Sequence, residues 1–127
     1  MRKEKKTALL VLGSERNRTF RETLRELRFD PTFLGSMEAV LYALRHTQAS
    51  AVLVDRDRSE ADDLELVLNI RDLDDRIPIF LVGRPARRQT EDLLWRQPAT
   101  FLIHKAVNDT SLGQELIPFI EAHASGS

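Results

Sequence analysis

Short apolar runs alternate with charged segments along this chain, and the alternation predicts repeated strand–helix units. Residues 8–12 form a continuous apolar run that ends at Gly13 and Ser14, which is typical of a strand buried on both faces. Comparable runs recur along the chain. The predicted strands are 8–12, 32–34, 51–54, 77–82 and 101–103. Asp30 and Pro31 stop the preceding helix in this reading, so 32–34 is expected to be a short edge strand.

The segments between these runs carry apolar residues at helical spacing. Ser36 is expected to cap the second helix, and Asp109 or Thr110 the last one. Pro118 is expected to kink or end the last helix, because proline removes a donor and clashes one turn back. The predicted apolar faces are Phe20, Leu24 and Leu27; Met37, Val40, Leu41 and Leu44; Leu64, Val67, Leu68 and Ile70; and Leu112, Leu116 and Ile120, with a short further helix over 91–96.

Five strand–helix repeats predict a single α/β domain over residues 1–127. The expected architecture is flavodoxin-like: a parallel sheet in the order 2-1-3-4-5, with helices on both faces. Residues 1–6 form a basic leader in this interpretation, and 124–127 resemble the start of a linker or an added end. The apolar stretch after the leader is too short for a signal peptide, so no membrane segment is expected.

Composition narrows the function classes further. The net charge of −1 attracts neither nucleic acid nor an anionic membrane. The absence of cysteine excludes disulfides and thiolate sites, and the three histidines lack ligand spacing. We therefore expect a cytoplasmic domain without cofactor or metal and without enzymatic activity of its own.

Polar residues follow four of the predicted strands, at the sheet edge where open parallel sheets carry their chemistry. Asp55 directly follows the third strand and is the leading candidate. The other candidates at this edge are Gly13, Ser14 and Glu15 after the first strand, Asp57 after the third, Gly83 and Arg84 after the fourth, and His104 and Lys105 after the fifth.

Over nearly its whole length the chain resembles the receiver domains of two-component response regulators. The resemblance puts Asp55 at the phosphoryl-accepting position, and either His104 or Lys105 at that of the strand-five lysine. Gly13 and Ser14 replace the acidic pair that holds magnesium. Gly83, or Val82 in the other register, replaces the strand-four hydroxyl, and the proline after the lysine is missing.

These replacements weaken the implied magnesium site. Mg²⁺ is bound through hard oxygen ligands, and phosphoryl transfer needs its charge. Asp55, the carbonyl of Asp57 and Glu15 would make only a weak site. We therefore predict a degenerate receiver in which Asp55 caps or forms a turn. A working phosphoacceptor and a small-ligand sensor are the alternatives.

Two narrower resemblances suggest a larger protein. Residues 51–55, 77–83 and 101–110 are similar to the amino-terminal wing domain of bacterial ornithine/lysine/arginine decarboxylases, which precedes a pyridoxal-phosphate domain. Residues 82–86 are similar to the receiver-like domain ahead of the ATPase in enhancer-binding transcription activators. Either resemblance implies a non-catalytic regulatory or assembly domain, with the active or DNA-binding part beyond Ser127.

Several side chains are candidates for contacts. Arg84, Arg87 and Arg88 form either an anion contact or a solvated loop facing the acidic third-strand loop, with the loop preferred. Trp95 is expected in the core, with an interface anchor as the alternative. Ile117 and Phe119 fall off the apolar stripe of the last helix. They predict a protein partner, with a homodimer through that helix as the expected form.

Overall fold

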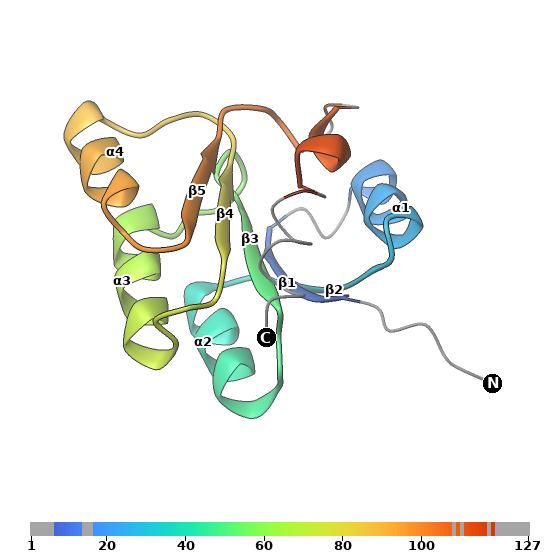
Figure 1. Ribbon diagram of the computed structural model, residues 1–127, viewed down its shortest axis with the longest axis horizontal. Coiled ribbons are helices and arrows are strands. Elements are labelled where there is room, and N and C mark those ends of the chain that lie inside the picture. The colour runs from blue at the N-terminus through green and yellow to red at the C-terminus, as the bar shows by residue number, and fades with distance from the viewer. Residues whose placement is uncertain (1–6, 14–16, 108, 110, 117, 119–127) are drawn as a thin grey trace.

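The fold is a five-stranded parallel sheet with helices on both faces, as predicted (Figure 1). The computed structural model describes residues 7–13, 17–107, 109, 111–116 and 118. The strand order is β2-β1-β3-β4-β5, and all four pairings are parallel. In chain order the elements are β1 (Thr7–Leu12), α1 (Arg18–Glu26), β2 (Phe29–Leu34), α2 (Met37–His46), β3 (Ala51–Asp55), α3 (Asp63–Leu73), β4 (Ile79–Val82), α4 (Arg88–Trp95) and β5 (Thr100–Ile103).

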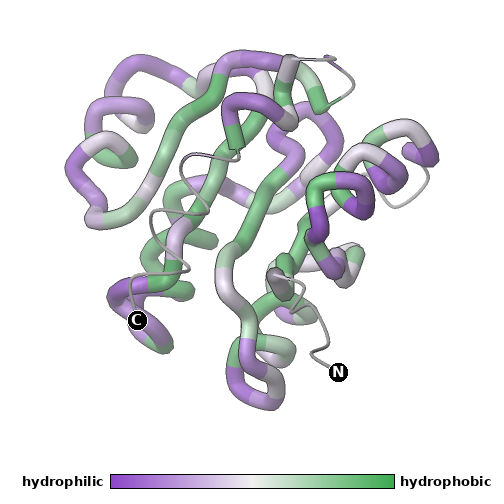
Figure 2. The backbone as a smooth tube through the Cα atoms, turned by 45° about the vertical axis from the view of Figure 1, so that its right-hand side comes forward, coloured by the Kyte–Doolittle hydropathy of each residue, from purple (hydrophilic) through white to green (hydrophobic). Residues whose placement is uncertain are grey.

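Two hydrophobic clusters lie on the two faces of the sheet. Leu53 belongs to the cluster beneath α1 and the C-terminal helical residues 112–116, whereas Val52 and Val54 belong to the cluster beneath α2, α3 and α4. The alternation follows from the period-two geometry of a strand. Figure 2 shows the strands as mostly hydrophobic tubes in the middle of the molecule. The sheet is therefore covered on both sides, and its strand ends remain for function.

The entry to β2 differs from the prediction. Asp30 and Pro31 were expected to stop a helix, but α1 has already ended at Glu26, and the strand begins at Phe29. Arg28 takes a left-handed conformation, with φ 66°, and turns the chain into the strand. Pro31 is tolerated because β2 is an edge strand, where one missing donor costs no ladder bond on the open side.

The predicted helix faces are correct in part. The Ser36 hydroxyl caps α2 by accepting a hydrogen bond from the Ala39 amide at 3.1 Å, as predicted. On α3 the prediction that Leu68 is in the core is wrong: it is 46% exposed, and Leu66 is buried instead. Trp95 was also expected in the core, but its side chain is 62% exposed at the end of α4. These two errors arise because an apolar residue on the exposed side of a helix cannot be told from a core residue by its type alone.

The C-terminal helical residues 112–116 pack closely on α1. Leu112 and Leu116 are buried, as predicted. A β-carbon at Gly113 would lie 2.8 Å from Leu27 Cδ1 and 3.2 Å from Thr23 Cγ2, so any larger residue would require the Leu27 side chain to move. Pro118 is itself helical, but residues 117 and 119 lie outside the described residues, so the expected kink or end stays a prediction.

Some predicted positions lie outside the described residues: Ser14, Glu15, Thr110, Ile117, Phe119 and Ile120. Within the described ranges, no helix combines the length and apolar character that a bilayer crossing requires.

Candidate functional site

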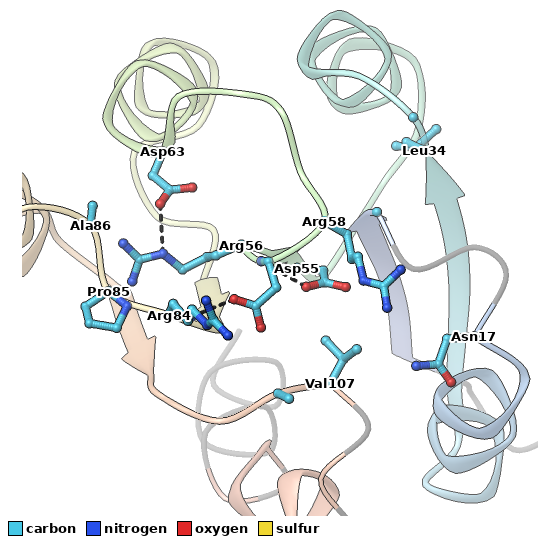
Figure 3. Close-up of a pocket in the computed structure, with 14 residues that line it drawn as sticks. Asn17, Leu34, Asp55, Arg56, Arg58, Asp63, Arg84, Pro85, Ala86 and Val107 are labelled. Atoms are coloured by element: carbon cyan, nitrogen blue, oxygen red, sulfur yellow. Dashed lines mark hydrogen bonds and ion pairs between the residues drawn. The ribbon is translucent and has the colours of Figure 1, made fainter.

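A cleft of about 1040 Å³ opens at the carboxyl ends of the strands (Figure 3). It is lined by four of the predicted residues: Gly13, Asp55, Asp57 and Arg84. The structure adds several residues that were not predicted, among them Asn17, Arg56, Arg58 and Asp63. The predicted residues Gly83, Arg87, Arg88, His104 and Lys105 do not line the cleft.

Asp55 is the buried carboxylate of the cleft, with 1% of its surface exposed. Its Oδ1 accepts a hydrogen bond from the Asp57 amide at 3.2 Å. Its carbonyl accepts from the amides of Arg58 and Ser59 at 3.2 and 2.9 Å. Asp55 therefore organises the turn that follows β3, and whether it is also an acceptor stays open to the test below.

Gly13 stands where the family resemblance placed a magnesium ligand. It has a φ of 93°, which disfavours other residues. A β-carbon there would lie 3.3 Å from Asp55 Cβ and 3.7 Å from Arg58 Cβ. In Figure 3 the Arg58 side chain lies beside Asp55 and extends into the cleft. Among the described residues, a guanidinium group thus lies beside the candidate acceptor on this side.

Gly83 occupies a position at which the receiver resemblance implies a hydroxyl residue. The side chain of Asp57 fills the space that a side chain at this position would need. A β-carbon at Gly83 would lie 3.0 Å from both Cγ and Oδ1 of Asp57. The same Oδ1 accepts a hydrogen bond from the Arg84 amide at 2.9 Å. Arg84 thus contacts the acidic loop after β3 through its backbone amide. The choice between an anion contact and a solvated loop for Arg84, Arg87 and Arg88 stays a prediction; the structure shows that the backbone of Arg84, not its guanidinium, contacts Asp57.

Arg56 organises the other side of the cleft, and sequence analysis missed it. Its guanidinium donates to both carboxylate oxygens of Glu91 at 2.9 Å, and its Nε donates to Asp63 Oδ2 at 2.8 Å. Only 2% of the Arg56 side chain is exposed. Bidentate pairs of this type fix geometry as well as charge. Arg56 therefore joins the turn after β3 to the start of α3 and to α4.

A sequence feature could have revealed this network. Glu91 precedes the buried Leu94 by three residues, so both lie on the inner side of α4. A carboxylate on the apolar side of a short helix requires a cation in the fold. Arg56 follows a strand on the same sheet edge and was one of the candidates for this cation.

One guanidinium faces two carboxylates in this network, and burial and pairing shift the pKa values of two of these groups. Burial raises the pKa of the Asp63 carboxyl, although Arg56 partly offsets that effect. Burial acts to lower the pKa of Arg56, but its bonds to Glu91 and Asp63 outweigh burial, so the pKa is raised. His104 Nε2 lies 3.6 Å from Glu91 Oε1, with half of its side chain exposed. A protonated His104 would therefore supply the second positive charge.

Lys105 is directed to the C-terminal helical residues. Its Nζ donates to Ser111 Oγ at 2.7 Å and lies 3.1 Å from Glu115 Oε1. Of the two candidates for the strand-five lysine, His104 contacts Glu91 and Lys105 contacts Ser111 and Glu115. In neither case is a contact with Asp55 present among the described residues.

The described residues do not fit a magnesium ion. Gly13 offers no side chain, Asp57 Oδ1 is engaged by the Arg84 amide, and Arg58 introduces positive charge. Within the part of the chain that the structure describes, no group of three His, Cys, Asp or Glu side chains is arranged to hold a metal. Among the described residues, the buried Asp55 is thus not accompanied by the further carboxylates of a metal site.

No family model and no curated protein matches this chain. Solved structures do match in fold. A CheY-like response-regulator receiver domain from Methanospirillum hungatei is 12% identical, with a TM-score of 0.79 over 96% of this chain and 99% of that chain. The receiver domain of a sensor histidine kinase from Pseudomonas aeruginosa, with magnesium in its active-site cleft, is 19% identical, with a TM-score of 0.72 over 97% and 100%.

A response regulator from Thermotoga maritima in complex with Mg²⁺-BeF is 18% identical, with a TM-score of 0.70 over 89% of this chain and 98% of that chain. At these identities the similarity shows the fold and not the chemistry. The chain therefore has the flavodoxin-like fold of response-regulator receiver domains.

Proposed function

We propose that this domain is a non-catalytic regulatory and protein-interaction module whose receiver-like cleft has lost magnesium-dependent phosphorylation. The observation that carries the proposal is the pair Gly13 and Arg58. Where a receiver would place carboxylates around a cation, this chain has a glycine in a positive-φ conformation and a guanidinium beside Asp55. A cation bound there would face like charge instead of compensating ligands.

The Arg56 network supports the same proposal. In a phosphorylation-dependent switch, the added phosphoryl group and its cation make new contacts that bias a two-state element. Here α4 is already attached to the turn after β3 by a bidentate pair between Arg56 and Glu91. Positioning of α4 then depends on this chain's own side chains. A partner can read the resulting surface without a chemical step at Asp55.

The proposal is tested with acetyl phosphate and with beryllofluoride in millimolar Mg²⁺. Intact mass spectrometry is expected to show no gain of a phosphoryl group. A magnesium titration is expected to leave the amide NMR signals of Gly13, Asp55 and Asp57 unshifted. The matched control is Asp55→Asn, which removes the acceptor but keeps an oxygen to accept the Asp57 amide. Arg58→Glu, which reverses the charge beside Asp55, is expected to increase the response to magnesium.

The alternative function is a phosphoacceptor that uses Asp55. It is favoured by the place of Asp55 at the carboxyl end of β3, in a cleft of about 1040 Å³. An acyl phosphate that forms on the wild-type chain and disappears in Asp55→Asn would establish this alternative and end the first proposal.

The kind of larger protein that contains this domain is also part of the proposal. The two narrower sequence resemblances imply an amino-terminal domain of a decarboxylase or of an enhancer-binding activator. In both cases the domain would contribute assembly or regulation. The coding sequence after Ser127 in the native gene distinguishes them, because a pyridoxal-phosphate domain and an ATPase domain have unrelated sequences.

A further inference from the structure

Two helices on opposite faces of the sheet carry opposite charge. Residues 17–29, which include α1, contain four arginines and two glutamates, a net charge of +2. Residues 55–76, which include α3, contain nine acidic residues and four arginines, a net charge of −5. The packing of α1 and α3 in separate clusters places them on opposite faces of the sheet, and Figure 1 shows them at opposite sides of the molecule. The small net charge of the whole chain conceals this separation.

The arginines of α1 form a stripe. Arg18, Arg21 and Arg25 are spaced i, i+3, i+7, so they share one side of the helix. The Arg21 guanidinium lies 5.1 Å from the centre of the Phe33 ring, which places the stripe over the edge strand β2. Arg18 and Arg25 are exposed. Glu22 and Glu26 are also exposed, and Glu22 lies one turn from both Arg18 and Arg25. The three arginines outnumber the two glutamates of α1, so this side of the helix keeps a net charge of +1.

The outer side of α3 has a matching arrangement. Glu65, Leu68 and Asp72 show the same i, i+3, i+7 spacing. Both carboxylate residues are exposed, and Leu68 between them is 46% exposed. In each helix the two charged ends are separated by two turns, a rise of about 10 Å. Two carboxylates of one molecule can thus face two guanidinium groups of another, with Leu68 against the apolar stem of Arg21.

We propose that copies of this chain associate head to tail, with the arginine stripe of α1 in one molecule on the acidic side of α3 in the next. The two surfaces differ, so the contact is heterologous and extends into rings or chains. Each exposed ion pair contributes little, so the association is weak and is screened by salt. This surface is separate from the cleft and does not depend on the function proposed for it. It also differs from a homodimer through the last helix, which would be apolar and insensitive to salt.

The test is sedimentation velocity over a wide concentration range at low and high salt. Wild-type protein is expected to self-associate at low salt and to dissociate at high salt. The double variants Arg18→Glu/Arg25→Glu and Glu65→Arg/Asp72→Arg are each expected to associate roughly tenfold or more weakly than wild type. An equimolar mixture of the two variants is expected to regain association, because each reversed surface then meets its complement on the other variant.

The matched control is Arg45→Glu on α2, an exposed arginine outside both surfaces, which is expected to leave association unchanged. Circular dichroism establishes that all variants are folded. A wild-type chain that is monomeric at low salt and high concentration would overturn the proposal. So would association that survives high salt, reversed variants that associate like wild type, or a mixture that fails to recover.

Discussion

Two arginines lie inside this domain at opposite ends of the sheet, and their guanidinium groups have different kinds of hydrogen-bond partner. Arg56, at the carboxyl ends of the strands, donates to the carboxylates of Glu91 and Asp63. Arg71, at the amino ends, donates to main-chain carbonyls, among them Ile77 O at 2.7 Å and Ala99 O at 3.1 Å. The carbonyls of Asp74 and Pro98 and the hydroxyl of Thr100 complete its set.

Because the partners differ, the contacts of Arg56 are sensitive to charge, whereas those of Arg71 are structural. The group around Arg56 holds one guanidinium against two carboxylates, and it borders the cleft. Any change in protonation or in a nearby ion alters its balance. Burial lowers the pKa of Arg71, and Asp74 and Asp75 partly offset this. Its carbonyl partners do not titrate, so Arg71 joins α3 to β4 and β5 independently of pH. Adjustable contacts therefore belong to the cleft end of the sheet.

The largest effect is expected from Arg56→Met. The substitution keeps most of the apolar stem but leaves the carboxylates of Asp63 and Glu91 close together without their cation. Breaking a buried ion pair by removing one partner costs about 3–5 kcal/mol. The free energy of unfolding, measured by urea denaturation, is expected to fall by about this amount. The observed cost is expected at the lower end, because the carboxylates keep 11–14% exposure.

A second variant sharpens this prediction. Arg56→Met combined with Glu91→Gln removes one of the uncompensated charges, so the double variant is expected to be more stable than Arg56→Met alone. Additive losses in the double-mutant cycle would show that Arg56 and Glu91 do not act together, and the proposed attachment of α4 would then be wrong.

A smaller loss is expected from Arg71→Met. The variant leaves several carbonyls without their donor, and each unsatisfied buried acceptor costs about 1–3 kcal/mol. Some of these carbonyls are near solvent and can bind water instead, so we expect a total of about 2–3 kcal/mol. Arg71→Lys is expected to recover only part of the lost stability, because one ammonium group cannot reach the carbonyls that precede β4 and those that precede β5 at once. A loss that changes strongly with pH would contradict the structural role.

The sequence predicted the architecture because the fold depends on patterns that recur over many residues. Apolar runs and helical spacing predicted five strands and their order, and Ser36 was recognisable as a cap. Pro31 was misread because a proline in an edge strand looks the same in sequence as one that ends a helix. Leu68 and Trp95 were misread because an exposed apolar residue breaks the helical pattern without any compensating feature nearby.

Sequence analysis could identify only those site residues that are marked by their position in the chain. Asp55, Asp57 and Gly13 were found because they directly follow strands. The partners of Arg56 lie seven and 35 residues away. The local signal was the carboxylate of Glu91 on the inner side of α4, which indicates a cation partner but not which one. The direction of Lys105 toward Ser111 depends on where the last helix packs. That packing depends in turn on the approach of Gly113 to Leu27, a contact between distant segments.

The smallest effect expected is on the titration of two aspartates, Asp63 and Asp109. Burial raises the pKa of Asp63, and two hydrogen bonds from Ser111 lower the pKa of Asp109. An NMR carboxyl titration is expected to place the midpoint of Asp63 above the ordinary value of about 3.9 and that of Asp109 below it.

The two aspartates therefore change the stability of the fold with pH in opposite directions. Asp109 stabilises the fold above its unfolded pKa, and this contribution is lost as pH falls through the folded pKa. Asp63 destabilises the fold at higher pH, and this penalty disappears as pH falls through its raised pKa.

The variants connect this titration to the two arginines. Arg56→Met is expected to raise the pKa of Asp63 further, because it removes the positive charge that opposes burial. Ser111→Ala is the matched control and is expected to move only Asp109, back toward its ordinary value. Arg71→Met is expected to leave Asp63 unchanged, since Arg71 bonds at the other end of the sheet. If Arg71→Met moved the midpoint of Asp63 as far as Arg56→Met does, the two ends would be electrostatically coupled. Charge sensitivity would then extend through the whole domain instead of belonging to the cleft.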